Sequence, residues 1–178
     1  MDYFEVFGLS RALDINTATL EKTFHELSRK YHPDYFTTGS EAEKAQALTM
    51  TAQLNDAYRT LRHPIHRVEY LLELEGFKPD GSKVPQALLM EAFEINEQLE
   101  EVRAGAASVE QVDSLRAQIH QKRDQFDTEL RQASQEWDEL LKNGAPEPKR
   151  KQQLAKLTEI LSESSYIRNL ERDLENAN

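Results

Sequence analysis

The sequence of 178 residues contains no cysteine, which excludes a disulfide framework and leaves no thiolate to bind zinc or an iron–sulfur cluster. No apolar run approaches the roughly 20 residues that a membrane-spanning helix needs. The N-terminus has no long apolar segment and carries Asp2 and Glu5, so neither a secretory nor a transit peptide is indicated. We therefore expect a cytoplasmic protein of a reducing compartment, with no membrane partner.

The chain also lacks any excess of positive charge. Its formal net charge is −10. The first 75 residues carry 8 Lys and Arg against 12 Asp and Glu, and the remainder carries 14 against 20. Proteins that bind nucleic acid rely on clustered positive charge to neutralise phosphates. The composition therefore argues against a nucleic-acid partner for either half of the chain.

Nearly all of the sequence has the pattern of helices. A hydrophobic fraction of 38% with 30% charged residues suits long helices with narrow buried stripes. Asp2 and Ser40 are each followed three residues later by Glu, which is the spacing of a capping box. Asn16 is a suitable N-cap, and Pro64 occupies the favoured first position of a helix. The N-terminal part thus predicts four helices, the second and third forming an antiparallel hairpin.

The C-terminal part predicts three longer helices. Turn-forming residues over 76–83 mark a linker, and the first helix is expected from Pro85 to Gly105. A capping box at Ser108 opens the second helix, and Gly144 to Pro148 separate it from the last. Lys122 falls in the buried register of the second helix and should extend its ammonium group to a bundle edge. The predicted fold is all-α, with an N-terminal domain over 1–75 and an elongated three-helix bundle over 84–178.

The tripeptide His32-Pro33-Asp34 ends the second helix, because Pro33 disfavours helical backbone at His32 and lacks an N–H donor. The residues that follow, 35–39, are expected to have no regular structure. Functional residues are often held on loops by a rigid scaffold, although a proline that merely stops a helix would explain a bare tripeptide. A catalytic His–Asp dyad is disfavoured, because no Ser or Thr lies in a recognisable nucleophile elbow.

A second motif, His63-Pro-Ile-His66, could be interpreted as a pair of metal ligands. Pro64 at a helix start instead favours a helix cap and a surface histidine. We predict no metal site, no cofactor and no enzymatic activity.

The helix that follows Pro85 has more large apolar residues than one buried face needs. Its complete core stripe consists of Leu88, Ala92, Ile95, Leu99 and Val102. At 100° per residue, three further apolar residues fall on another face beside three carboxylates: Leu89, Met90 and Phe93, with Glu94, Glu97 and Glu101. Exposed, they would form a protein-binding patch; the alternative is that this wide face packs between two neighbouring helices. Tyr166, off the main stripe of the last helix, could join the patch.

In its helical setting, the His-Pro-Asp motif resembles the signature of J-domain proteins, which bind DnaK-type chaperones and stimulate their ATP hydrolysis. The whole chain is similar to the HscB family of J-domain co-chaperones in iron–sulfur cluster assembly. The stretches that carry this resemblance are Met1-Asp-Tyr-Phe, Tyr31-His-Pro-Asp, Leu61-Arg-His-Pro, Glu69-Tyr-Leu-Leu and Leu89-Met-Glu. The absence of a cysteine-rich module before the J-domain favours a bacterial-type member.

The resemblance implies two partners: the DnaK-type chaperone HscA and the scaffold protein IscU. The chaperone-binding residues that it implies are His32, Pro33, Asp34, Lys22, Arg29 and Lys30. Tyr35 stands where many J-domains have lysine, which removes a charge beside the motif. The scaffold-binding residues that it implies are Leu89, Met90, Phe93, Glu94, Glu97, Glu101 and Tyr166. The protein is expected to be a monomer; a J-protein with another client and a coiled-coil structural adaptor stay open as alternatives.

Overall fold

The structure is a computed structural model that describes residues 1–78 and 88–177. Most of the predicted linker, 76–83, and the helix start predicted near Pro85 lie outside these residues. The described residues form helices and turns and contain no strand, which confirms the all-α prediction. No helix within them is long and apolar enough to cross a bilayer.

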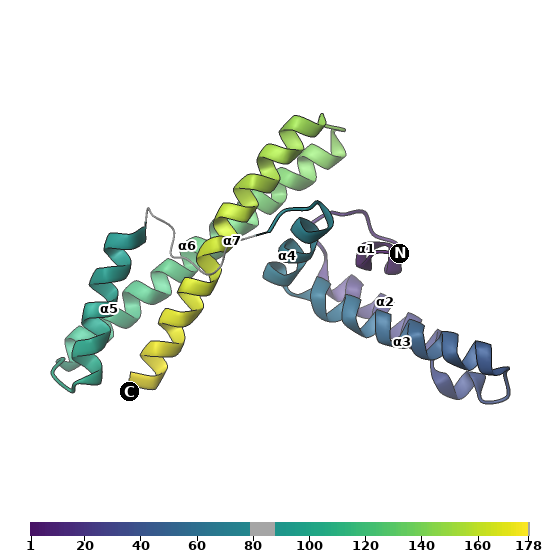
Figure 1. The fold of residues 1–178 in the computed structure, drawn as a ribbon, viewed down its shortest axis with the longest axis horizontal. Helices are drawn as coiled ribbons and strands as arrows, with labels where there is room; N and C mark the ends of the chain where they lie inside the picture. Colours follow the sequence, from purple (N-terminus) through teal and green to yellow (C-terminus); the bar gives the residue numbers. More distant parts are fainter. Residues whose placement is uncertain (79–87, 178) are drawn as a thin grey trace.

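The N-terminal part contains four α-helices and one 3-10 helix. They are α1 (Tyr3–Val6), α2 (Thr17–Lys30), η1 (Pro33–Phe36), α3 (Glu41–Arg62) and α4 (Pro64–Leu74). Helices α2 and α3 pack side by side as the predicted hairpin, with α1 lying against α3 (Figure 1). The His32-Pro33-Asp34 turn is therefore at the tip of this hairpin, away from the other helices.

The predicted helix starts are confirmed by their caps. Asp2 and Ser40 each form a capping box with the Glu three residues later, and the Asn16 side chain accepts a hydrogen bond from the Thr19 N–H. The expectation of irregular backbone directly after Asp34 is wrong. Pro33 fixes a helix-compatible φ and the His32 side chain caps the turn, so η1 extends through Phe36.

Three further helices, α5 (Leu89–Arg103), α6 (Val109–Lys142) and α7 (Glu147–Ala177), form the C-terminal bundle. A capping box at Ser108 opens α6, as predicted. The predicted break between the last two helices, 144–148, is too long, because α7 already begins at Glu147. Proline is tolerated in the first turn of a helix, where its missing N–H has no partner to lose, so Pro148 does not delay α7.

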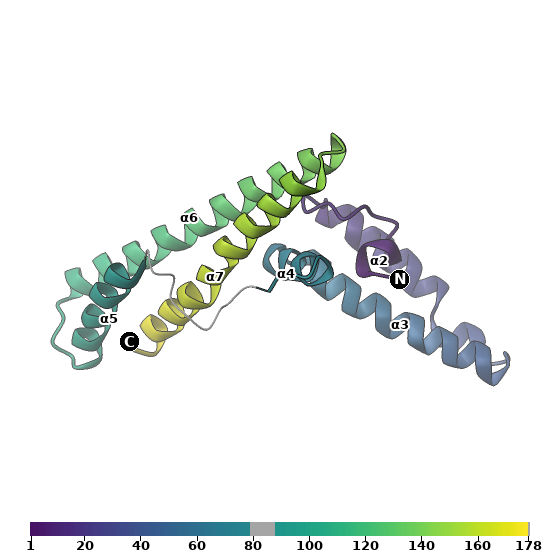
Figure 2. The same cartoon turned by 45° about the horizontal axis from the view of Figure 1, so that its top comes forward.

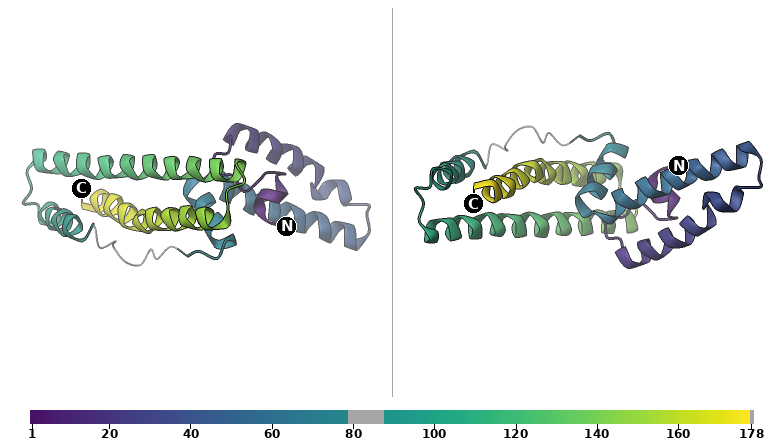
Figure 3. Two further views of the ribbon diagram at one scale, coloured as in Figure 1. Left: turned by 90° about the horizontal axis from the view of Figure 1, so that it is seen from above. Right: turned by 90° about the horizontal axis from the view of Figure 1, so that it is seen from below.

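The molecule is elongated, with α6 and α7 forming a long antiparallel hairpin at its centre (Figure 2). The 34 residues of α6 correspond to about 50 Å at 1.5 Å per residue. Helix α5 lies beside the far end of this hairpin, whereas the α2–α3 tip points to the opposite end of the molecule (Figure 3). The two predicted binding surfaces are therefore far apart.

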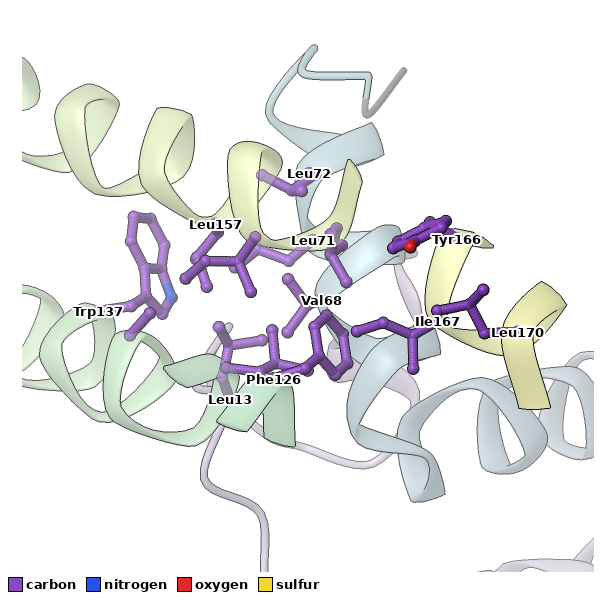
Figure 4. Close-up of a cluster of buried hydrophobic side chains, with 14 of the residues drawn as sticks. Leu13, Val68, Leu71, Leu72, Phe126, Trp137, Leu157, Tyr166, Ile167 and Leu170 are labelled. Atoms are coloured by element: carbon purple, nitrogen blue, oxygen red, sulfur yellow. The ribbon is translucent and has the colours of Figure 1, made fainter. Parts of the chain in front are cut away.

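One hydrophobic core joins the two parts of the chain. Val68 and Leu71 of α4 are buried beside Phe126 of α6 and the α7 residues Leu157 and Ile167 (Figure 4). Burial of apolar surface stabilises by about 25 cal/mol per Å². Separating α4 from the bundle would expose several of these side chains, so the junction contributes to the stability of both parts.

A set of hydrogen bonds, here called the Asp138 clamp, fixes the loop between α1 and α2 to the end of α6. The Asp138 carboxylate accepts the backbone N–H groups of Leu13 and Asp14, each at 2.7 Å. The adjacent Trp137 indole donates to the carbonyl of Arg11 at 2.9 Å. Three backbone groups of the loop are thus satisfied by two consecutive residues of the bundle.

Arg67 ties the same loop to the N-terminal helices. Its side chain is buried, with 4% of the residue exposed, and its Nε donates to the carbonyl of Leu61 at 2.6 Å. A second guanidinium nitrogen donates to the carbonyl of Leu13. Leu13 thus accepts from Arg67 and donates to Asp138, so the loop is held from both sides.

Candidate functional site

The His32-Pro33-Asp34 turn presents its polar groups to solvent. The His32 side chain is 54% exposed and that of Asp34 84% exposed. His32 Nδ1 accepts the backbone N–H of Asp34 at 3.3 Å, and the Asp34 carboxylate lies 3.5 Å from the same nitrogen. The imidazole orientation is therefore fixed from within the turn, while the Asp34 carboxylate stays open to a partner.

The base of the turn is anchored to α3. The Thr51 hydroxyl donates to the carbonyl of Tyr31 at 3.0 Å. Beyond the motif, the Tyr35 ring is 72% exposed and lies edge-on to the His32 ring. An apolar ring thus stands beside the motif where a charge is common in J-domains.

The three cations predicted on α2 are exposed, as the helical period indicates. Lys22 and Arg29 form no ion pair with any described residue, and Lys30 lies over the Tyr31 ring, 5.3 Å from its centre. Because their charges are not neutralised within the described chain, Lys22, Arg29 and Lys30 are available to an acidic surface. Such charges chiefly accelerate association and set orientation.

Helix α5 has the two faces that its sequence predicts. Ala92, Ile95, Leu99 and Val102 are buried, and Leu88 is half-buried against the core, which confirms the core stripe. On another face Leu89 is 52%, Met90 80% and Phe93 69% exposed. The alternative of a wide packed face is thereby excluded, and we call these three residues the α5 patch.

Three carboxylates border the α5 patch. Glu94, Glu97 and Glu101 are all exposed, and none forms an ion pair with a described residue. A small apolar surface with a charged border is characteristic of protein-binding sites. Its chemistry fits a partner that offers an apolar contact and nearby cations.

Ion pairs hold both ends of α5 against the other bundle helices. Near its start, Glu91 lies 2.8 Å from the Lys122 ammonium group on α6. Lys122 is 9% exposed, as expected of a lysine in the core register that reaches the bundle edge. Near the end of α5, Arg103 lies 3.5 Å from Asp173 of α7. These contacts fix the direction in which the α5 patch faces.

Tyr166 does not add an exposed ring to the α5 patch, which contradicts that part of the prediction. It is 8% exposed and belongs to the bundle core. Its hydroxyl is buried and has no hydrogen-bond partner among the described residues. Burial, together with the nearby Glu91 carboxylate, raises the pKa of Tyr166 to about 12.

The two histidines at the start of α4 lie on the surface. His63 occupies the N-cap position without a side-chain capping bond, and its ring meets that of His66 edge-on. Among residues 1–78 and 88–177, no group of three His, Asp or Glu side chains is placed to hold a metal ion.

Sequence reasoning missed the partners that fix these sites. The periodicity placed Lys122 correctly but could not identify Glu91 as its counterion. The Asp138 clamp was also unexpected, because Asp138 and Leu13 are 125 positions apart. The one available signal was an acidic residue next to a buried tryptophan, which many surface helices share.

Comparison with known proteins identifies both halves of the chain. Residues 84–175 match the family model described as the HSCB C-terminal oligomerisation domain, and residues 2–70 match the DnaJ domain. The solved structure of the chaperone HscB from Vibrio cholerae is 28% identical, with a TM-score of 0.75, over 98% of this chain and 96% of that one. Human co-chaperone HscB is 27% identical, with a TM-score of 0.72, over 99% of this chain and 81% of that one.

Proposed function

This chain belongs to the HscB family of J-domain co-chaperones, and from that premise we propose that it binds the scaffold IscU, delivers it to the chaperone HscA and stimulates the ATPase of HscA. The role would be to aid the maturation of iron–sulfur proteins. The observation that supports this most strongly is the position of two exposed surfaces at opposite ends of one molecule: the His32-Pro33-Asp34 turn and the α5 patch.

In this proposal the α2–α3 tip binds the chaperone. Lys22, Arg29 and Lys30 would guide the hairpin onto an acidic surface. Asp34 would then accept a charge-assisted hydrogen bond from a basic group of the chaperone. The His32 side chain, which accepts the Asp34 N–H, holds the turn in the shape that this contact needs.

The α5 patch would bind the scaffold. Leu89, Met90 and Phe93 supply apolar area, and Glu94, Glu97 and Glu101 supply charge around it. Burial of the patch would contribute most of the affinity, whereas the exposed carboxylates would favour partners with matching cations.

The mechanism is tethering. Because the shared core and the Asp138 clamp fix the two parts relative to each other, a scaffold held at α5 would meet the chaperone at a raised effective concentration when the turn engages it. The hydrolysis of ATP is then carried out by the chaperone, and this protein supplies two binding surfaces and no reacting group.

The proposal is tested by the steady-state ATPase of HscA, measured with and without IscU. The wild-type protein should stimulate strongly and in synergy with IscU, whereas His32→Gln should abolish stimulation and retain scaffold binding. Stimulation that ignores IscU would instead support the alternative of a J-protein with another client.

A second measurement tests the scaffold surface alone. Charge reversal at Glu97 and Glu101 should weaken the binding of IscU in calorimetry while leaving basal stimulation of HscA intact. Reversal at Glu129 of α6 and Glu159 of α7, two exposed carboxylates that form no ion pair with a described residue, changes the charge equally and serves as the control. Equal affinity for the test variant and the wild type would overturn the assignment of the scaffold site.

The oligomeric state also stays a proposal. We expect a monomer, although the matching family model carries oligomerisation in its description. Sedimentation should give a mass near 20.6 kDa at every concentration. A mass that grows with concentration would favour the coiled-coil adaptor.

A further inference from the structure

Lys122 occupies a position on α6 that the sequence pattern assigns to the bundle core. Leu115, Ile119 and Phe126 share its stripe and are buried, and Lys122 itself is 9% exposed. Burial of an ammonium group costs hydration, whereas an apolar side chain of similar length would occupy the same position without that cost. Residues that depart from a local rule of folding are often functional, so Lys122 is a candidate for a role beyond packing.

The ammonium group of Lys122 interacts with carboxylates on both neighbouring helices. It lies 2.8 Å from a carboxylate oxygen of Glu91, in the first turn of α5. On α7, burial raises the pKa of the half-buried Glu163; the charge of Lys122 opposes this change, and nearby carboxylates add to it. One buried cation therefore lies between the carboxylates of α5 and α7.

The start of α5, which carries two residues of the α5 patch, has few other anchors. Residues 89–91 are exposed, and Ala92, the first buried residue of the helix, offers only a methyl group. Leu88 at the N-cap position forms no side-chain capping bond. Helix ends without such support fray readily. The ion pair between Glu91 and Lys122 thus holds the first turn of α5 at a point where packing is sparse.

We propose that Lys122 is a positioning residue for scaffold binding, which acts through Glu91 to hold the first turn of α5 where the α5 patch can meet its partner. With 10% of its side chain exposed, Lys122 adds little direct contact of its own. If the first turn is ordered for only a fraction of the time, the apparent affinity of the patch falls by that fraction. The inference rests on the proposed function, because it concerns the surface assigned to IscU.

The first test measures the affinity of the full chain for IscU by calorimetry. Lys122→Met keeps an unbranched stem without the charge and should bind about ten-fold more weakly, which corresponds to a first turn ordered about a tenth of the time. Stimulation of HscA without IscU should stay at the wild-type level, because the α2–α3 tip lies at the opposite end of the molecule. The free energy of unfolding in urea should change little, because the Glu91 side chain is 46% exposed and water can solvate it.

Lys156→Met is the matched control. It removes an ion pair between α7 and α6, with Glu136 at 2.6 Å, that does not involve α5, and it should bind IscU as the wild type does. Glu91→Gln should weaken binding as much as Lys122→Met does. The double variant Glu91→Gln/Lys122→Met should be no weaker than either single variant, because both changes remove the same ion pair.

Hydrogen exchange tests the position of the first turn directly. In an α-helix each N–H bonds to the carbonyl four residues earlier, so the N–H groups of Phe93 and Glu94 report on the carbonyls of the first turn of α5. Both N–H groups should exchange faster in Lys122→Met than in the wild type and in Lys156→Met.

Equal affinity of Lys122→Met and Lys156→Met for IscU would overturn the proposal, as would unchanged exchange in α5 or additive losses in the double variant. A loss of basal HscA stimulation together with IscU binding would also overturn it, because Lys122 would then support the whole fold. If the wild type itself does not bind IscU, the proposed function is wrong, and the exchange of Phe93 and Glu94 still tests whether Lys122 positions α5.

Discussion

Asp138 contributes to stability through the two backbone N–H groups that it accepts. The residue is only partly buried, and burial raises its pKa although the N–H groups of Leu13 and Asp14 oppose that change. The charged carboxylate is thus partly desolvated, and it accepts the two loop N–H groups in that position. The buried N–H group of Leu13 would otherwise have no partner on the bundle.

We expect Asp138→Ala to lower the free energy of unfolding by about 1–3 kcal/mol, because it leaves the part-buried N–H group of Leu13 without an acceptor. Urea denaturation measures this change. Asp124→Ala is the matched control, because it makes the same replacement within α6 at an exposed position and so shares any gain in helix propensity. Equal stability of the two variants would show that the clamp contributes nothing.

Tyr166 gives a prediction at alkaline pH. Its pKa is raised from 10.0 to about 12, so the folded state holds the phenol proton more tightly than the unfolded state. The resulting stability is complete below pH 10 and is lost as pH rises towards 12. Tyr166→Phe removes this dependence, and it should cost little at neutral pH because the hydroxyl has no partner among the described residues.

The measurement compares urea denaturation of the wild type and Tyr166→Phe at about pH 8 and about pH 11. The wild type should lose about 1 kcal/mol more between these two values than the variant does. If the wild type and Tyr166→Phe lose the same free energy of unfolding between the two pH values, the phenol must be solvated in the folded protein.

At the scale of elements, α5 separates stability from recognition on two faces of one helix. Leu99 is fully buried, whereas Phe93 is 69% exposed. Leu99→Ala should lower the free energy of unfolding by about 2–5 kcal/mol, and Phe93→Ala by less than about 0.5 kcal/mol. Thermal denaturation measures both, and a large loss in Phe93→Ala would show that this side chain packs against the protein.

The two faces of α5 were predictable because a helical period identifies which residues share a face. Capping boxes likewise predicted the starts of α1, α3 and α6. Periodicity does not show which helix covers which, however. The exposure of Phe93 and the burial of Tyr166 depend on how α5 packs against α7. This tertiary contact cannot be predicted from the local sequence pattern.

At the scale of the whole molecule, the shared core predicts a single unfolding transition. Trp137 is the one tryptophan in the sequence and lies at the Asp138 clamp, so its fluorescence reports on the junction. Helix content, measured by circular dichroism, reports on the entire chain. The two curves in urea should coincide. A fluorescence change at lower urea would mean that the junction opens before the helices melt.

The arrangement of the two parts could not be predicted from the sequence. Contacts across the junction join positions that are 125 and 126 residues apart, and they involve backbone groups that leave no trace in composition. The linker composition predicted a boundary over 76–83, and the domain bounds stay a prediction because most of that segment lies outside the described residues. The buried junction adds that one continuous core joins the two parts.

The form of the Asp138 clamp determines which substitutions the loop can accept. At position 14 the clamp uses only a backbone N–H, and the Asp14 side chain is exposed. Nineteen of the twenty common amino acids provide that group, and proline is the exception. The clamp therefore leaves the choice of residue at position 14 nearly free, whereas proline there would remove one of the three hydrogen bonds that hold the loop on the bundle.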